Sequence, residues 1–438
     1  MPVKKKVSVI KNANKSTSKV IKKNEAVTKQ KRIVPVDSPL FIENNKLIEC
    51  RSKTIRKAII PSGVTEIGEY AFFGCNHLTS IEIPDSVTVI GENAFEQCER
   101  LKEINIPASV TKIGASAFVD CINLTSIVIP KGVKEIEFAT FQNCVRLTKI
   151  KIPDSVTTIN EYAFDQCEYL EKINIPNSIC QIYDGAFEGC MSLRKIVLPA
   201  GITKICDSTF YDCWNLENIT IPDGVTLIDT YAFGQCRSLP HINLPASVME
   251  IGDSAFSDCW DLTSIEIPNG VTEIKDLTFC NCENLTNIKL PNSITKIGKG
   301  VFNQCINLKS IEIPNGVSKI DDDAFSRCKI FSIKIPNSVK EIGKEAFSDC
   351  KNLTKVEIEN GVARIADEAF SKCVSLTGIK IPSSVKEIGK EAFSDCENLT
   401  KVEIENGQTK IVRGAFSKCK SLKQIIISGN VKKIRIKS

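Results

Sequence analysis

Residues 255–274 read AFSDCWDLTSIEIPNGVTEI, and this stretch carries the pattern that decides the fold. Its phenylalanine, Phe256, belongs to a series that recurs every 23 residues from residue 72 to residue 325. The next step is 22 residues, to Phe347, and the interval of 23 then returns as far as Phe416. A cysteine follows three residues behind each phenylalanine, so sixteen copies of one unit span residues 72–419. A period held in phase for so long predicts a solenoid of stacked coils and not a set of globular domains.

Each copy follows the pattern L-x-x-I-x-I-P-x-x-V-x-x-I-G-x-x-A-F-x-x-C-x-x. The I-x-I segment alternates apolar and polar residues, which predicts a short strand, and proline ends it because it has no N–H for the ladder. V-x-x-I predicts a second inward-facing segment, and the glycine after it favours a turn. A-F-x-x-C predicts a single helical turn in each coil. About sixteen such coils, at the roughly 4.8 Å spacing of neighbouring strands, would make a β-rich rod or arc about 75–80 Å long.

The cysteines of the repeat are predicted to be structural. Catalysis by a thiol needs a thiolate and a base, and zinc needs clustered ligands, but the chain has only two histidines and its repeat cysteines form no C-x-x-C pairs. We therefore expect a column of small, buried, free thiols, with no catalytic residue, no metal and no cofactor. Four further cysteines break the pattern, and among them Cys280 is expected to be the most exposed. The others are Cys50, Cys180 and Cys206.

The words I-x-I-P-x-x-V-x-x-I-G and A-F-x-x-C resemble the 23-residue, BspA-like class of leucine-rich repeats, also called the Treponema pallidum type. The resemblance covers roughly residues 59–434. It implies a right-handed leucine-rich-repeat superhelix. It also implies adhesion or protein-interaction roles, often at the surface of bacteria or parasitic protists.

The ends of the chain differ from the repeats. We expect a basic, disordered arm at residues 1–38, a cap with a first partial repeat at 39–71, the solenoid at 72–424, and a cap with a basic tail at 425–438. Up to residue 40 the chain has eleven Lys or Arg and two acidic residues. The arm is either a solvated tail or an electrostatic contact for an acidic protein, nucleic acid or a membrane surface.

Targeting signals and membrane spans are not evident in the sequence. No apolar run reaches the roughly 18 residues that a membrane span needs, and the N-terminus lacks the apolar core of a secretory signal. The many free cysteines are typical of a reducing compartment. Together these features favour a cytoplasmic location, whereas the family resemblance favours the cell surface.

Two sets of residues are candidates for binding a protein partner. The first is the central outward residue of the I-x-I strands before residue 250, which reads Val128, Lys151, Asn174, Val197, Thr220 and Asn243. After residue 260 the same column alternates Glu and Lys, which predicts a structural charge ladder. Its members are Glu266, Lys289, Glu312, Lys334, Glu357, Lys380 and Glu403.

The second set follows the repeat cysteine, where successive coils carry Met191, Trp214, Arg237 and Trp260. Stacking would place Arg237 between two indoles as a cation–π sandwich, with Tyr211 beside it. The set is either an interaction hot spot or a self-contained surface stack. The expected function is a non-enzymatic protein-binding scaffold or adhesion module. The alternative is a structural component of a larger intracellular or viral assembly, docked through the basic arm.

Overall fold

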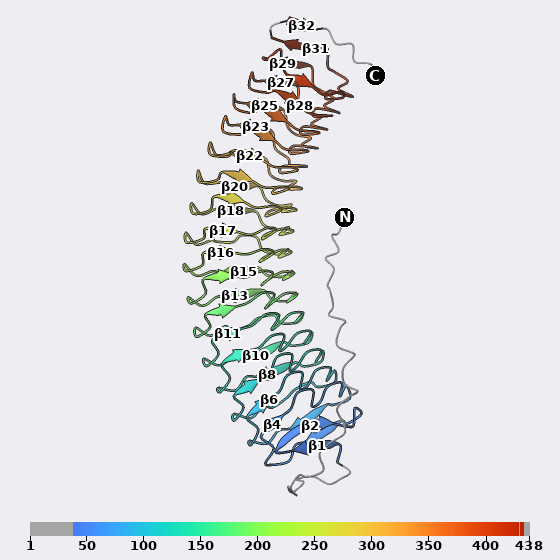
Figure 1. The fold of residues 1–438 in the computed structure, drawn as a ribbon, viewed down its shortest axis with the longest axis vertical. Coiled ribbons are helices and arrows are strands. Elements are labelled where there is room, and N and C mark those ends of the chain that lie inside the picture. The colour runs from blue at the N-terminus through green and yellow to red at the C-terminus, as the bar shows by residue number, and fades with distance from the viewer. Residues whose placement is uncertain (1–37, 429, 433–438) are drawn as a thin grey trace, which may run out of the picture.

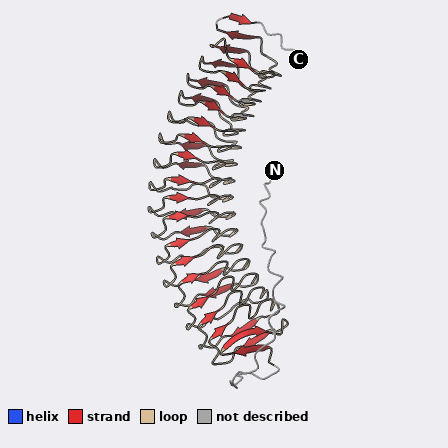
Figure 2. Cartoon of the chain, in the orientation of Figure 1, coloured by secondary structure: helices blue, strands red, loops and turns tan. Residues whose placement is uncertain are grey.

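The described residues form one curved column of stacked coils (Figure 1). The computed structural model describes residues 38–428 and 430–432, so the predictions for the basic arm and the basic tail fall largely outside the described residues. About 17 turns of about 23 residues make up a β-solenoid, which confirms the predicted fold class. Within the described ranges every regular element is a strand (Figure 2).

Two columns of parallel strands run the length of the solenoid. The V-x-x-I segments form one column of two-residue strands: β4 (Glu66–Ile67), β6 (Val89–Ile90), β7 (Lys112–Ile113), β9 (Glu135–Ile136), β11 (Thr158–Ile159), β12 (Gln181–Ile182), β14 (Lys204–Ile205), β16 (Leu227–Ile228), β17 (Glu250–Ile251), β19 (Glu273–Ile274), β21 (Lys296–Ile297), β22 (Lys319–Ile320), β24 (Glu341–Ile342), β26 (Arg364–Ile365), β28 (Glu387–Ile388) and β30 (Lys410–Ile411). The I-x-I segments form the other: β3 (Lys57–Ile59), β5 (Ser80–Glu82), β8 (Ser126–Val128), β10 (Lys149–Lys151), β13 (Lys195–Val197), β15 (Asn218–Thr220), β18 (Ser264–Glu266), β20 (Asn287–Lys289), β23 (Ser332–Ile335), β25 (Lys355–Ile358), β27 (Gly378–Ile381), β29 (Lys401–Ile404) and β31 (Gln424–Ile427).

An antiparallel hairpin lies at each end of the described column. At the N-terminal end β1 (Leu40–Glu43) pairs with β2 (Lys46–Cys50), and β2 continues into the V-x-x-I column through β4. At the C-terminal end β32 (Asn430–Lys432) pairs with β31 of the I-x-I column. Each hairpin covers the edge of one strand column, and exposed sheet edges are sites of unwanted pairing between chains.

The core is a ladder of stacked phenylalanine rings. Neighbouring rings are nearly parallel, with interplanar angles from 2° to 18° and centroid separations from 5.1 to 5.7 Å. Leucine, isoleucine, valine and cysteine columns surround the ladder, and most of their members are buried. Each coil buries its apolar residues only against its neighbours, so the stability of one coil depends on the next.

The predicted helical turn at A-F-x-x-C is wrong. The segment forms two linked β-turns, as at Asn93 to Cys98, where Glu96 N donates to Asn93 O at 3.1 Å and Cys98 N donates to Phe95 O at 3.1 Å. Asn93 and Gln97 have φ of 53° and 60°, which a right-handed helix does not allow. The alternate N–H groups point to the next coil, where Phe95 N donates to Ala117 O at 2.8 Å. These bonds between coils replace the bonds that a helical turn would make within the segment.

A longer repeat of three coils is superimposed on the 23-residue unit. The I-x-I column is interrupted at every third coil, those of Asn105, Asn174, Asn243 and Glu312, and the first three contribute only isolated bridges to the following coils. The first three of these coils carry asparagine, a residue with low β propensity, between their two apolar residues, and the fourth carries Glu312 there. Thr140 and Thr209, 69 residues apart, replace the usual alanine. Their hydroxyls donate to backbone carbonyls three residues earlier, at 2.7 and 2.8 Å.

Candidate functional site

Arg237 lies between the two tryptophans, as the repeat register predicts. Its guanidinium carbon is 4.3 Å from the ring centroid of Trp214 and 4.3 Å from that of Trp260. The backbone of each coil is bonded to the next at this position, since Ser238 N donates to Trp214 O and Asp261 N donates to Arg237 O, both at 3.0 Å. We call the three side chains of Trp214, Arg237 and Trp260 the Trp–Arg stack.

Polar contacts fix the Trp–Arg stack from within the same coils. Arg237 Nη2 donates to Gln235 Oε1 at 3.0 Å, and Gln235 Nε2 donates to the Tyr211 hydroxyl at 2.5 Å. Trp214 Nε1 donates to Asp212. Burial raises the pKa of Asp212, while this hydrogen bond and the charge of Arg237 oppose the increase. The arginine and the first indole are therefore held in place before any partner arrives.

The stack is open to solvent along its indoles. The exposed fraction is 36% for Trp214 and 39% for Trp260, whereas Tyr211 and Met191 are half-buried. Tyr211 packs edge-on against Tyr231, with centroids 5.6 Å apart and rings at 83°. Tyr211 thus lies beside the Trp–Arg stack, as predicted, and contacts its network through its hydroxyl.

The strand-face candidates lie on a different part of each coil. Val128 and Lys151 are register partners on β8 and β10, and Val197 and Thr220 are partners on β13 and β15. The coils of Asn174 and Asn243 have no regular strand at their I-x-I segments. All six side chains are exposed. Among the described contacts none links them to the Trp–Arg stack, so the two candidate sets are separate surfaces.

Asn243 borders a hollow on the strand face. The hollow has a volume of about 540 Å³ and is lined by polar and apolar residues of β18, β20 and the coil before them. The polar ones include His241, Ser264, Glu266 and Lys289. Its ion pair joins Lys289 Nζ to Glu266 Oε1 at 3.1 Å, as the charge ladder predicts.

Further along, the charged residues pair with one another in a different register from the one predicted. Lys334 Nζ contacts Glu359 Oε1 at 2.8 Å, and Lys380 Nζ contacts Glu405 Oε1 at 2.7 Å. The predicted strand-face neighbours were Glu357 and Glu403. Glu359 and Glu405 stand where proline ends other strands, and each pairs with the lysine of the preceding coil.

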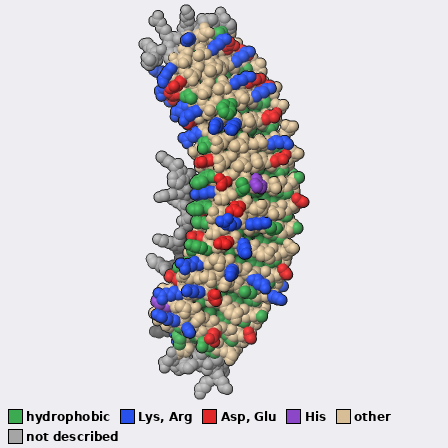
Figure 3. Space-filling view, turned by 180° about the vertical axis from the view of Figure 1, so that it is seen from behind, with side chains coloured by type: hydrophobic (Ala, Val, Ile, Leu, Met, Phe, Trp, Pro, Cys, Tyr) green, Lys and Arg blue, Asp and Glu red, His purple; other side chains and the backbone are tan. Residues whose placement is uncertain are grey.

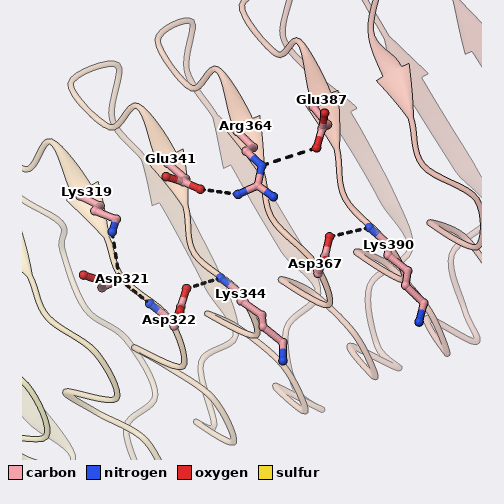
Figure 4. A network of polar contacts seen from close by, with 9 residues as sticks. All are labelled: Lys319, Asp321, Asp322, Glu341, Lys344, Arg364, Asp367, Glu387 and Lys390. Carbon is pink, nitrogen blue, oxygen red and sulfur yellow. Dashed lines mark hydrogen bonds and ion pairs between the residues drawn. The ribbon is translucent and has the colours of Figure 1, made fainter.

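A second charge network joins the V-x-x-I strands of the same half (Figure 4). Arg364 Nη1 contacts Glu341 Oε1 at 2.7 Å, and Arg364 Nε lies 3.6 Å from Glu387 Oε1. Beside them, Lys390 N donates to Asp367 Oδ1 at 2.8 Å. Figure 3 shows one face of the column, where acidic and basic side chains are interspersed along its length. Many charged side chains of the C-terminal half therefore form ion pairs that join neighbouring coils.

Three lysines that belong beside the strand-face candidates were missed by the sequence reasoning. Lys149, Lys172 and Lys195 occupy one position in successive coils, two residues before Lys151, Asn174 and Val197. All three are exposed. The signal was present in the sequence, because residues two apart on a strand share a face.

The repeat cysteines form the predicted buried column of free thiols. Each thiol from Cys98 onward donates to the phenylalanine carbonyl of the preceding coil, as Cys236 Sγ does to Phe210 O at 3.3 Å. Burial raises the pKa of Cys236. Among the described residues no group of three or more potential metal ligands is found. The thiols therefore act as hydrogen-bond donors between coils.

Cys180, and not Cys280, is the exposed cysteine. Cys180 occupies an outward position between the two buried isoleucines of a V-x-x-I segment, Ile179 and Ile182. Cys280 is half-buried, and burial raises its pKa to about 11.

We expect a disulfide-forming thiol reagent to modify one cysteine of the twenty rapidly in the folded protein. That residue is Cys180, because it is the one cysteine whose side chain is exposed to the reagent. The rate is measured by absorbance of the released thiol at neutral pH. Cys180→Ser should remove the fast phase, and a fast phase of several thiols, or one that persists in this variant, would contradict the assignment.

The fold and surface together define a repeat scaffold: a β-solenoid with a continuous apolar ladder inside and variable side chains outside. The family model described as "BspA type Leucine rich repeat region (6 copies)" matches residues 42–170, 134–259, 203–331 and 318–438. The chain therefore belongs to the BspA-type leucine-rich-repeat family. Among curated proteins no sequence matches. Within the described residues no helix is long and apolar enough to cross a membrane.

Several solved bacterial structures are similar to this chain. A leucine-rich repeat protein from Bacteroides ovatus is 29% identical, with a TM-score of 0.62, over 86% of this chain and 90% of that one. A leucine-rich cell surface protein from Faecalibacterium prausnitzii is 28% identical, with a TM-score of 0.41, over 92% and 96% of the two chains. A leucine-rich repeat protein from Eubacterium ventriosum is 23% identical, with a TM-score of 0.43, over 80% and 88%.

Proposed function

We propose that this protein is a non-enzymatic scaffold that binds a protein partner through the Trp–Arg stack. The observation that carries the proposal is a guanidinium held between two partly exposed indoles, at 4.3 Å from each ring. Tryptophan and arginine are the residues that most often dominate binding energy at interfaces. A stack that is already ordered loses little side-chain entropy when a partner covers it.

Membership of the BspA-type family supports a binding role, and adhesion is its more specific form. The strand-face residues Val128, Lys151, Val197 and Thr220 are proposed as additional contacts, because they are exposed on neighbouring coils. Asn174 and Asn243 extend this surface between the strands. Met191 and Tyr211 border the stack and are proposed as its rim.

The test is affinity capture from the native source with the wild-type chain and with Trp214→Ala/Trp260→Ala. We expect the double variant to bind the captured partner at least about 100-fold more weakly, as is typical when two hot-spot residues are lost. Ile306→Ala is the matched control, since Ile306 also follows a repeat cysteine and is 47% exposed. Equal binding by the wild-type chain and the double variant would refute the role of the stack.

The competing function is an assembly component docked through the basic arm. It predicts that the partner is lost when residues 1–38 are removed, or when the salt concentration is raised above about 0.5 M, because screening weakens exposed charge contacts. The scaffold proposal predicts that the partner is retained in both cases. Loss of the partner in either case, with the Trp–Arg stack intact, would favour the assembly function.

A further inference from the structure

Four lysines form a compact basic surface on the strand face. Lys149 begins β10 and Lys195 begins β13, while Lys172 lies on the coil between them and is bridged to Lys195 in parallel register. Lys151 lies on the same face of β10. We call these four residues the lysine patch. All are exposed, and none takes part in the ion pairs found among the described residues.

The lysine patch is a cluster of like charges without ion pairs, whereas several strand-face charges on later coils are paired. Like charges opposite one another on neighbouring strands destabilise a sheet. On later coils the equivalent face pairs Lys289 with Glu266 at 3.1 Å and Lys380 with Glu405 at 2.7 Å. One glutamate in these coils would relieve the repulsion, yet three consecutive coils carry lysine at the same position. The charge is therefore available to an anionic ligand from outside the solenoid.

We propose that the lysine patch binds an extended acidic segment of a protein partner, lying along the solenoid axis. Val128 and Val197, 59% and 53% exposed, stand in the central column with Lys151 between them. They are three coils apart, about 14 Å at the strand spacing, which four or five extended residues span. The matching segment has clustered Asp or Glu with an apolar residue at each end.

Two other occupants fit less well. The column from Val128 to Val197 and the lysine column beside it contain no aromatic residue on which bases could stack, which disfavours single-stranded nucleic acid. Residues 1–37 have eleven basic and two acidic side chains, so this segment has the wrong charge. An acidic segment of a partner complements both the charge and the apolar ends of the patch. This surface is separate from the Trp–Arg stack, but Val128, Lys151 and Val197 are among the contacts already proposed. The inference therefore rests on that part of the proposed function and adds the chemistry of the partner segment.

The test uses the full chain and a fluorescent peptide, Gly-Ser-Leu-Glu-Asp-Glu-Asp-Leu-Ser-Gly, with a second peptide in which Gln and Asn replace the acids. We expect Lys149→Glu/Lys172→Glu/Lys195→Glu to weaken binding of the acidic peptide by about tenfold or more. The control is Lys57→Glu/Lys355→Glu/Lys401→Glu, which reverses three exposed lysines at the same position of other I-x-I strands. The control should bind within about twofold of wild type.

The basic arm is present in every variant, so its own attraction for the peptide cancels from the comparison. Equal weakening by the two triple variants would overturn the proposal, as would equal binding of the two peptides. Oligodeoxythymidylate is tested as a competitor of the acidic peptide. If it displaces the peptide from the wild-type chain, and if its own binding is lost in the first triple variant but not in the control, the patch would be assigned to nucleic acid. That result would also overturn the proposal. Trp214→Ala/Trp260→Ala should leave peptide binding unchanged, so failure of the Trp–Arg stack and failure of the patch can be told apart.

Neutral substitutions separate loss of binding from loss of folding. Lys149→Gln/Lys172→Gln/Lys195→Gln removes the repulsion together with the binding charge. We expect this variant to bind the peptide more weakly than wild type and to unfold at the same or a higher temperature, measured by circular dichroism. A lower unfolding temperature would show that the lysines stabilise the fold, and would overturn the view that they are retained for binding.

Discussion

Raising the pH from about 8 to about 10.5 is expected to unfold the solenoid, because its core contains sixteen repeat thiols that must stay protonated. Burial raises the pKa of Cys98 and Cys350 to about 12, and that of Cys419 to about 11. The remaining repeat thiols are also shifted upward. Their contribution to stability is complete below the unfolded pKa near 9 and is lost as the pH rises toward the folded values.

The expected size of this effect follows from proton linkage. Between the unfolded and folded pKa values, each thiol lowers the free energy of unfolding by about 1.4 kcal/mol per pH unit. Sixteen thiols together exceed the roughly 5–15 kcal/mol by which most domains are stable. Cys50, whose pKa is lowered to about 7 chiefly by its hydrogen bond with Cys75, has the opposite sign but is a single group.

Circular dichroism in urea at several pH values measures this dependence. Replacing several ladder cysteines by serine, which keeps a donor without an acidic thiol, should flatten it. A free energy of unfolding that stays constant up to about pH 10.5 would contradict the account of the thiol ladder.

Phe233→Ala is expected to destabilise the protein by about 3–5 kcal/mol. The Phe233 ring is fully buried and stacks at 5.5 Å on Phe210 and at 5.5 Å on Phe256. Its removal leaves a cavity and breaks the ladder on both sides, so two coil interfaces weaken at once. Urea unfolding followed by circular dichroism gives the change in free energy.

Phe138→Ala is the control for the Phe233 substitution, because the Phe138 side chain is 47% exposed. It should cost less than about 1 kcal/mol, as surface substitutions usually do. A similar cost for the two variants would mean that the ladder is not the source of stability. If the surrounding core repacks and fills the cavity, Phe233→Ala would instead lower the free energy of unfolding by less than about 2 kcal/mol.

The features predicted correctly are those that repetition alone determines. The phenylalanine ladder, the thiol column and the position of Arg237 between two indoles all follow once one position of a coil lies above the same position of the next. No knowledge of the coil's internal conformation is needed for these predictions. The period of 23 residues was therefore sufficient for them.

The features predicted wrongly depend on backbone conformation inside a coil. The turns around Phe95 need left-handed residues, and at equivalent positions the chain uses Tyr70 and Glu345, which carry no sequence signal for positive φ. Cys280 was expected to be exposed from a helical turn that does not form. The partner of Lys334 was predicted wrongly, because strand register places Lys334 beside Glu357 but its flexible side chain pairs with Glu359, two residues further on.

Intrinsic fluorescence tests the central claim most directly, because the chain's only two tryptophans, Trp214 and Trp260, are both in the Trp–Arg stack. Acrylamide quenching of tryptophan fluorescence is measured for the wild-type chain alone and in complex with the partner captured from the native source. The emission of the partner alone is subtracted from that of the complex. Binding at the stack predicts that quenching falls on complex formation, since both indoles become covered. Unchanged quenching in a complex shown to be saturated would place the partner elsewhere and contradict the proposed function.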